Sequence, residues 1–168
     1  MKRILVTGAA GQIGTELVPA LLERYEGATV VATDIKEPAD ALPDGAVYAA
    51  LDCTDAAALN TLVVDRKIDT IYHLAAILSA TAEGVPQKAW DVNMGALYNI
   101  LEAAREHDLA VFTPSSIAAF GPETPPDPTP QDTIQRPNTL YGVSKVAGEL
   151  LADYYHTRFG VDARGVRY

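Results

Sequence analysis

Cysteine and histidine, the side chains that most often hold transition metals, are scarce in this sequence. Cys53 is the only cysteine among 168 residues, which excludes an internal disulfide framework and a cysteine-based zinc site. The three histidines, His73, His107 and His156, lie far apart and show no metal-ligand spacing. We therefore expect no metal, a reducing cytoplasmic location, and Cys53 as a small buried side chain.

Basic residues and long apolar runs are also few. The chain has 13 Lys and Arg against 22 Asp and Glu, a formal net charge of −9. Nucleic acids and anionic membranes attract basic patches, so this charge argues against either as the main partner. No apolar run is long enough to span a bilayer, and no signal-peptide pattern is present. A small molecule remains as the expected binding partner.

The sequence instead offers alternating strand and helix patterns in a chain of one-domain size, 48% hydrophobic and 21% charged. Predicted strands cover residues 4–7, 29–33, 46–51, 69–74, 109–113 and 162–168. Predicted helices begin within residues 8–14 and cover about 56–66, with Asp55 as cap, 87–107 and 138–159. Residues 35–45 are predicted as a loop or at most a short helix, and the stretch holding Ser79 and Gly84 is predicted as a loop. Strands joined by helical crossovers indicate an α/β fold: one Rossmann-type domain over residues 1–168. Its doubly wound parallel sheet has six strands and helices on both faces.

A glycine-rich stretch follows the first predicted strand. Gly8, Gly11 and Gly14 recur every three residues, and an amphipathic helix begins among them. A strand that turns sharply into a helix leaves the first N–H groups of that helix free for a phosphate or pyrophosphate. The spacing differs from the usual dinucleotide fingerprint because Ala10 stands where a glycine is common, and a turn without a ligand stays open on spacing alone.

The second predicted strand supports the dinucleotide interpretation. It ends in Asp34, 20 residues after Gly14. An acidic residue at about this distance hydrogen-bonds the adenosine ribose hydroxyls, and its charge disfavours a 2′-phosphate. We therefore predict NAD as cofactor. In such a sheet ligands bind beyond the carboxyl ends of the strands, where Asp52, residues 75–79 and Ser115–Ser116 also fall.

Residues 120–137 hold six of the eleven prolines. A linker between domains and a proline-rich peptide ligand are two alternatives for such a segment. A linker here would detach the last helix from a sheet that needs it. We interpret the segment as a wall on the substrate side, since long loops in compact folds often line pockets.

Tyr141 and Lys145 stand one turn apart at the start of the last predicted helix. A neighbouring ammonium favours the phenolate and is expected to lower the pKa of Tyr141, making it a general base for an alcohol proton. Ser116 would hydrogen-bond the same substrate oxygen, and Lys145 would also hold the nicotinamide ribose. Alternatively, Lys145 is a surface lysine over a half-buried tyrosine. Ser79 either contacts substrate, or caps or solvates its own loop.

These motifs together resemble the extended short-chain dehydrogenase/reductase superfamily. The shared features are Gly8-x-x-Gly11-x-x-Gly14, His73-Leu-Ala-Ala76, Ser116 and Tyr141-x-x-x-Lys145. Within it, LAAILSA (74–80), PSSIAAFGPETP (114–125) and IQRPNTLYGVSKVAGELL (134–151) are similar to short-chain-type L-threonine 3-dehydrogenases. Nucleotide-sugar epimerases share much of this plan, although their segment after His-Leu-Ala-Ala usually differs.

The resemblance implies a set of site residues. Ser116, Tyr141 and Lys145 form the catalytic set, and Ser79, Ser116 and Tyr141 contact substrate. NAD is implied to lie on Gly8, Gly11, Gln12, Ile13, Gly14, Asp34, Asp52, Leu74, Ala75, Ala76, Asn93 and Lys145. Within this set Asp34 would serve the ribose, Asp52 would lie near the adenine, and Asn93 would brace the active site.

The resemblance also implies a reaction and an assembly. The expected reaction is NAD-dependent oxidation of L-threonine to 2-amino-3-oxobutyrate, a step of threonine catabolism, in a homodimer. Family members continue past the sixth strand into a part that completes the substrate pocket, so we expect the 168 residues alone to be incomplete for activity. The alternatives are a nucleotide-sugar 4-epimerase or dehydratase with retained NAD, and a non-catalytic dinucleotide-binding protein.

Overall fold

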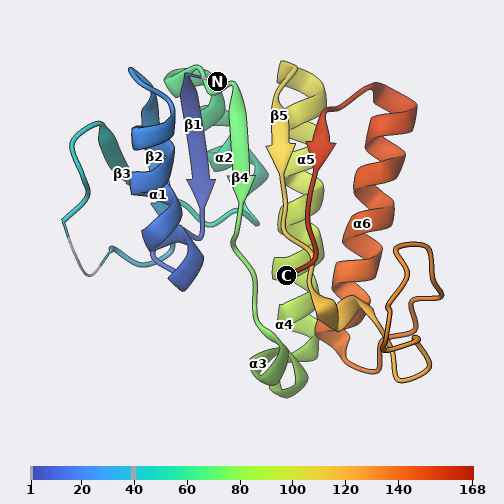
Figure 1. The fold of residues 1–168 in the computed structure, drawn as a ribbon. Helices are drawn as coiled ribbons and strands as arrows, with labels where there is room; N and C mark the ends of the chain where they lie inside the picture. The colour runs from blue at the N-terminus through green and yellow to red at the C-terminus, as the bar shows by residue number, and fades with distance from the viewer. Residues whose placement is uncertain (1, 39–40) are drawn as a thin grey trace.

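The computed structural model of the protein describes residues 2–38 and 41–168. It shows a six-stranded sheet flanked by helices (Figure 1). The elements are, in order, β1 (Arg3–Thr7), α1 (Gln12–Arg24), β2 (Thr29–Asp34), β3 (Ala46–Ala50), α2 (Ala56–Arg66), β4 (Thr70–His73), α3 (Ser79–Gly84), α4 (Pro86–Trp90), the π-helical turn η1 (Asp91–Gly95), α5 (Ala96–His107), β5 (Ala110–Phe112), the 3₁₀ turn η2 (Ile117–Ala119), α6 (Leu140–Phe159) and β6 (Ala163–Arg164). Of the helices in the described residues, none combines the length and apolar character that a bilayer crossing requires.

The strands lie in the order β3-β2-β1-β4-β5-β6, and every neighbouring pair is parallel. The chain therefore winds from β1 in one direction to β3, then crosses back to β4 and continues to β6. The predicted doubly wound Rossmann-type sheet of six strands is confirmed. Because β1 lies between β2 and β4, Thr7 at its end pairs with both Thr33 and His73. A ligand crevice is expected at this point of reversal.

Two apolar layers hold helices against opposite faces of the sheet. On one face Val18 and Leu21 of α1 pack against Ile4 and Val6 of β1. The larger layer joins α2, α5 and α6 to the other face. It contains Leu5, Leu59, Val63, Ile71, Ile100, Leu101, Val111 and Tyr155. β1 is apolar throughout because its side chains are buried alternately in both layers.

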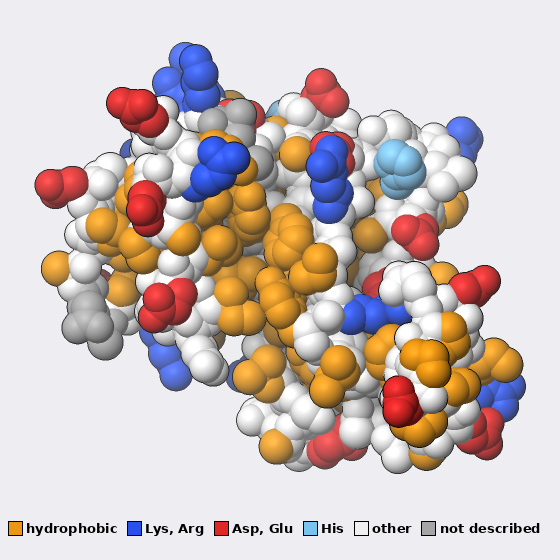
Figure 2. All heavy atoms as spheres, in the orientation of Figure 1, with side chains coloured by type: hydrophobic (Ala, Val, Ile, Leu, Met, Phe, Trp, Pro, Cys, Tyr) orange, Lys and Arg blue, Asp and Glu red, His pale blue; other side chains and the backbone are white. Residues whose placement is uncertain are grey.

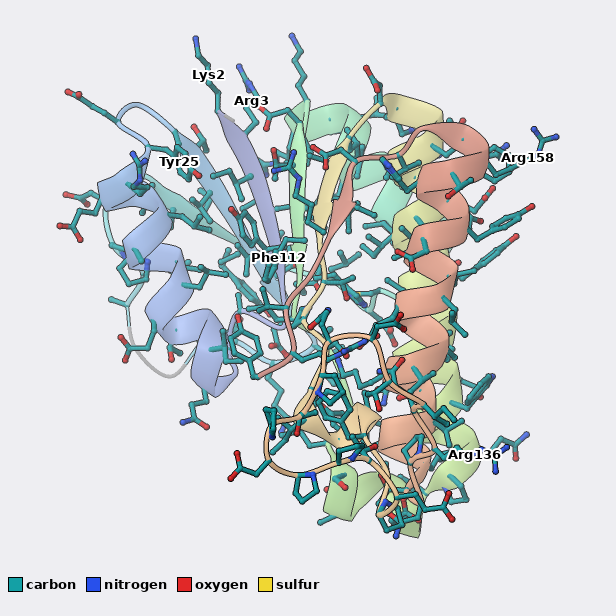
Figure 3. All side chains as sticks on the ribbon, turned by 45° about the vertical axis from the view of Figure 1, so that its right-hand side comes forward. Lys2, Arg3, Tyr25, Phe112, Arg136 and Arg158 are labelled. Atoms are coloured by element: carbon teal, nitrogen blue, oxygen red, sulfur yellow. The ribbon has the colours of Figure 1, made fainter. Side chains whose placement is uncertain are left out.

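The face that carries α1 is unevenly covered. On it, Tyr72 of β4 and Phe112 of β5 meet with ring centroids 5.5 Å apart, and both side chains are half-buried. Figure 2 shows hydrophobic side chains gathered across the middle of this face, and Figure 3 labels Phe112 on the sheet there.

The predicted elements occur with three differences. Residues around Ser79 and Gly84, predicted as a loop, form the short helix α3. The predicted helix 87–107 is continuous but contains the π-helical turn η1. The sixth strand is regular only at Ala163–Arg164, although Ser115 and Arg167 form one further parallel bridge. The loop 35–45 carries no regular element in its described part; residues 39 and 40 lie outside the described residues.

Asp55 caps α2 as predicted, accepting hydrogen bonds from the backbone N–H groups of Ala57 and Ala58, both at 3.0 Å. Cys53 is buried, also as predicted.

Candidate functional site

The turn between β1 and α1 brings strand and helix unusually close. Gly8 has a φ of +71°, and a Cβ atom there would lie 2.7 Å from the backbone nitrogen of Ala75. At Gly14 a Cβ atom would lie 2.5 Å from both the Cα of Ala9 and the carbonyl oxygen of Gly8. Contacts of this length leave no room for a side chain, so these two glycines are required by the backbone path.

The first turn of α1 opens toward the carboxyl edge of the sheet. Gly11 is the N-cap residue, and no side chain among the described residues caps the helix. Gln12 and Ile13 are the first helical residues, so their N–H groups have no partner within the helix. These donors and the helix dipole suit a pyrophosphate. A carboxylate that capped the helix would occupy the same donors, and none does so here among the described residues.

Asp34 lies at the end of β2, beside the glycine turn. Its carboxylate accepts hydrogen bonds from the backbone N–H of Ala10 at 3.1 Å and of Lys36 at 3.2 Å. The side chain is partly exposed, so the carboxylate retains acceptor capacity toward a ligand. This is the geometry expected for a group that binds ribose hydroxyls.

Asp52, just after β3, is exposed and bonded within its own turn. Its carboxylate accepts hydrogen bonds from the Thr54 hydroxyl at 2.7 Å and the Thr54 N–H at 2.9 Å. These bonds lower the pKa of Asp52, so the group is anionic at neutral pH.

The exit of β4 is fixed to β1 through Thr7. The Thr7 hydroxyl lies 2.8 Å from Nδ1 of His73 and 3.5 Å from the N–H of Ala75. The N–H of Leu74 donates to the Thr7 carbonyl at 3.0 Å. Burial, with a smaller effect of the Lys145 charge, lowers the pKa of His73 to about 3. His73 is therefore a neutral structural group beneath the site.

Asn93, on η1, holds the segment that follows β4. Its Oδ1 accepts from the N–H of Ile77 at 2.7 Å, and its Nδ2 donates to the Ile77 carbonyl at 3.0 Å. The same Nδ2 lies 3.3 Å from Oγ of Ser144, whose hydroxyl donates to the Tyr141 carbonyl. One amide therefore connects the segment after β4 to the first turn of α6.

The start of α6 is anchored from two sides. Thr139 Oγ1 accepts from the N–H of Gly142 at 3.0 Å, and the Glu83 carboxylate accepts from the N–H of Leu140 at 2.7 Å. A carboxylate at a helix N-terminus also interacts favourably with the helix dipole. These contacts fix the turn that carries Tyr141.

Ser116, Tyr141 and Lys145 come together at the ends of β5 and α6. Burial raises the pKa of Tyr141, and hydrogen bonding with the Ser116 side chain opposes this rise. Lys145 Nζ lies 5.3 Å from the centroid of the Tyr141 ring and donates to the Pro114 carbonyl at 2.8 Å. Burial lowers the pKa of Lys145 to about 8. Lys145 is thus partly buried and hydrogen-bonded, unlike a surface lysine.

The expected pKa of Tyr141 is wrong in direction. The sequence predicts a lowered value from the adjacent ammonium, whereas the pKa is raised above its ordinary value. The reason is that the ring is partly desolvated while Lys145 is directed at a carbonyl oxygen.

Ser79 is the first residue of α3 and is half-buried. The N-cap of α3 is Leu78, so the alternative that Ser79 caps its own segment does not describe this structure.

A cavity of about 480 Å³ lies between α6 and the ends of β5 and β6. It brings together four of the predicted residues, Ala75, Ala76, Asn93 and Lys145. Ser116, Tyr141, Ser79, Asp34 and the glycine turn do not line it. Its wall also contains Ser115, which the sequence analysis placed at this edge of the sheet. Three further residues of the wall, Ser144, Glu149 and Arg167, were not singled out from the sequence.

The fold and the glycine turn define a dinucleotide-binding protein of the Rossmann type. The chain belongs to the NAD dependent epimerase/dehydratase family, whose model matches residues 4–168. The resemblance found in the sequence is thereby confirmed at this level, and NAD is the cofactor. The described residues fit NAD, because the glycine turn admits no side chain, α1 begins uncapped, and an acidic side chain stands beside both.

Known proteins resemble the chain over its whole length. An uncharacterized epimerase/dehydratase of Staphylococcus haemolyticus is 56% identical over 169 residues, which cover 100% of this chain and 53% of the relative. The structure of an L-threonine dehydrogenase from Clostridium difficile matches this chain with a TM-score of 0.95 and 51% identity. The match covers 100% of this chain and 53% of the dehydrogenase chain. A nucleoside-diphosphate-sugar epimerase from Agrobacterium tumefaciens has a TM-score of 0.87 and 29% identity, covering 99% and 52%. The chain spans about half the length of the relatives it matches.

Proposed function

We propose that this chain carries the cofactor site and the Ser116–Tyr141–Lys145 set of a dehydrogenase that oxidises L-threonine to 2-amino-3-oxobutyrate. The observation that supports this most is the position of Tyr141 in the first turn of α6, with Lys145 Nζ 5.3 Å from its ring centroid and the Ser116 side chain near enough to affect its pKa. A binding protein without turnover has no need of such an acid–base pair. The 51% identity to an L-threonine dehydrogenase supports threonine as the substrate.

Each of the three residues has a distinct task in the proposed oxidation. Tyr141 accepts the proton of the threonine side-chain hydroxyl, and Ser116 hydrogen-bonds the same oxygen and keeps it in line. Lys145 is cationic at neutral pH and would hold the nicotinamide ribose beside Tyr141. Bound NAD supplies the acceptor for the hydride of the alcohol carbon.

The proposed cofactor contacts follow the same edge of the sheet. Gly8, Gly11 and Gly14 shape the turn, and the pyrophosphate would lie against the N–H groups of Gln12 and Ile13. Asp34 would accept hydrogen bonds from the ribose and Asp52 would lie near the adenine. Leu74, Ala75 and Ala76 would form the floor, held by Asn93, and Lys145 would reach the second ribose. Ser79 would contact the substrate.

A nucleotide-sugar epimerase is the second candidate, because the same three residues would serve it. The Agrobacterium epimerase shares the fold, and its 29% identity is well below the 51% of the threonine dehydrogenase. Epimerisation returns the hydride to the substrate and produces no free NADH, whereas oxidation of threonine accumulates NADH. Accumulation of free NADH therefore distinguishes the two candidates.

The test uses the protein encoded by the complete gene, purified and supplied with NAD. Addition of L-threonine should produce NADH in proportion to enzyme concentration, and Tyr141→Phe should abolish it. Nucleoside-diphosphate sugars are supplied in parallel and the products analysed for inverted sugar. Sugar inversion without NADH formation from threonine would replace the proposed function by the epimerase. Binding of NAD with neither reaction would favour the non-catalytic alternative.

A further inference from the structure

One face of α6 is attached to three consecutive residues at the end of β5. The Ser116 side chain is close enough to Tyr141 to oppose the rise of its pKa, Lys145 donates to the Pro114 carbonyl, and Glu149 accepts from the Ser115 hydroxyl. Tyr141, Lys145 and Glu149 are spaced four residues apart, so they lie along one side of the helix. The third of these contacts falls outside the Ser–Tyr–Lys set.

The Glu149 carboxylate is fully engaged by donors. Oε1 accepts from the Ser115 hydroxyl and from Nε of Arg167 at 2.9 Å. Oε2 accepts from Nη2 of Arg167 at 2.6 Å and from Nε2 of Gln135 at 3.3 Å. The Glu149 and Arg167 side chains are only 23% and 19% exposed, so the ion pair is largely shielded from solvent. Burial raises the pKa of Glu149, but the hydrogen bonds from Arg167, Ser115 and Gln135 outweigh it and lower the value.

The same cluster holds the proline-rich segment 120–137. Gln135 belongs to this segment, and Arg167 reaches the Gln131 carbonyl at 3.5 Å. The Arg167 guanidinium also lies 5.1 Å from the centroid of the Phe120 ring. The segment returns to α6 through Arg136, which Figure 3 labels near the start of that helix. The segment is thus in contact with the Glu149–Arg167 pair near both of its ends, through Arg167 at Phe120 and through Glu149 at Gln135.

The position of Ser116 depends on that of Ser115. Ser115 donates its N–H to the Val166 carbonyl at 2.8 Å, and its side chain is nearly buried. Ser116 follows in extended backbone, with φ −155° and ψ 155°. In extended backbone a residue's side-chain direction is set by its neighbour's, so fixing Ser115 fixes the direction of Ser116.

We infer that Glu149 is a positioning residue: by holding Ser115 and Arg167 it sets where Ser116 stands relative to Tyr141. The role in turnover rests on the proposed function, in which Ser116 and Tyr141 act on the substrate hydroxyl. The geometric part does not depend on the identity of the substrate.

Glu149→Gln tests this with little change of volume. All four partners of the carboxylate are donors, so the amide nitrogen of glutamine must face at least one group that needs an acceptor. Ser115→Ala is the second variant, since it removes only the contact to Ser115 and leaves the ion pair with Arg167 in place. The matched control is Asp162→Asn, which breaks the exposed pair with Arg164 on the same terminal segment.

The readout is the carbon-13 signal of the Tyr141 Cζ in the complete protein with labelled tyrosine, assigned by its loss in Tyr141→Phe. Glu149→Gln and Ser115→Ala should move this signal toward its position in Ser116→Ala, and Asp162→Asn should leave it unchanged. In turnover, kcat should fall by up to ~10²-fold, because a misplacement of about 1 Å can have that effect, while KM for NAD changes less.

A lowered melting temperature with the Tyr141 signal and kcat at parent values would show that Glu149 is only structural, and would overturn the inference. If Glu149→Gln does not fold, Ser115→Ala decides by the same criteria. A moved Tyr141 signal in a protein whose parent form does not oxidise threonine would uphold the positioning role and refute the proposed substrate.

Discussion

The Asn93 side chain holds the backbone of Ile77 at both its N–H and its carbonyl, at 2.7 Å and 3.0 Å. The two hydrogen bonds are like those that one residue of a neighbouring β-strand would make. Here a side chain makes them, because Ile77 follows the end of β4 and belongs to no strand of the described sheet. Because Asn93 is buried, removing it leaves two backbone groups of Ile77 without their partners.

We therefore expect Asn93→Ala to lower the free energy of unfolding by about 1–3 kcal/mol, the usual cost of orphaned buried polar groups. NAD binding should weaken as well, because residues 74–77 lose their support. Urea unfolding and calorimetric titration measure the two effects. The exposed Asn138→Ala serves as control and should change stability by less than ~0.5 kcal/mol.

Tyr141→Phe should reduce turnover by ~10²–10⁴-fold while NAD binding stays near the parent value, because the ring is kept and the proton acceptor is lost. Since the pKa of Tyr141 is raised, the phenolate is a minor form at neutral pH, and the parent rate should increase with pH above neutrality. Steady-state rates across the alkaline range measure this. Tyr154→Phe, on the exposed side of α6, is the control. A parent rate that falls as pH rises would contradict Tyr141 as the base.

Asp34→Asn should reduce the preference for NAD over NADP at least ~10-fold, or about 1.4 kcal/mol. The carboxylate repels a 2′-phosphate, whereas the asparagine oxygen still accepts from the N–H of Ala10 and preserves the turn. Calorimetric affinities for both cofactors give the ratio. Asp44→Asn, in the neighbouring loop and exposed, removes the same charge and should leave the ratio unchanged. Tighter binding of NADP than NAD by the parent protein would refute the assignment of Asp34.

Gly14→Ala should destabilise the protein by about 1–3 kcal/mol or prevent folding, because the new Cβ would meet backbone atoms at 2.5 Å that cannot move aside. Gly84→Ala is the matched control. Its Cβ meets nothing within 4 Å, so its effect on stability should be within ~0.5 kcal/mol of zero. Thermal unfolding of the two variants compares them directly. Equal melting temperatures would contradict the close packing of α1 on β1.

His73 should make the protein acid-sensitive. Its pKa of about 3 in the folded state lies below the value of about 6.5 expected when unfolded, so only the unfolded state gains this proton as pH falls through that window. Stability from this group is complete above pH ~6.5 and decreases by up to about 1.4 kcal/mol per pH unit below it. Urea unfolding at several pH values should show a shallower dependence for His73→Asn than for the parent.

Local sequence determines some of these features and distant contacts determine others. The glycine turn, the Asp55 cap and the alternation of strands with helices depend on residues a few positions apart, so the sequence predicts them. The helix α3 was missed because Ser79–Gly84 is too short to show an apolar period, and its place depends on packing against α6. The cluster of Glu149 with Ser115 and Arg167 joins residues 34 and 18 positions apart, and no local pattern announces it.

The pKa of Tyr141 illustrates the same limit at the level of one group. The spacing of Tyr141 and Lys145 correctly predicts that they are neighbours on a helix. The direction of the pKa shift depends on desolvation of the ring and on the hydrogen bond from Lys145 to the Pro114 carbonyl. The tertiary structure determines both.

The strand order also determines how long β1 waits for its two partner strands as the chain leaves the ribosome. β1 is made first, yet its place is in the middle of the sheet, and its second partner arrives late: Thr7 pairs with Thr33 on one side and with His73 on the other. At ~5–20 residues per second, the 40 residues between those partners take roughly 2–8 s to synthesise. During that interval the apolar residues Ile4, Leu5 and Val6 present an open strand edge, which another nascent chain can extend. Dense loading of ribosomes on one message would bring such open strand edges close together, so misassembly during translation follows from the place of β1 in the sheet.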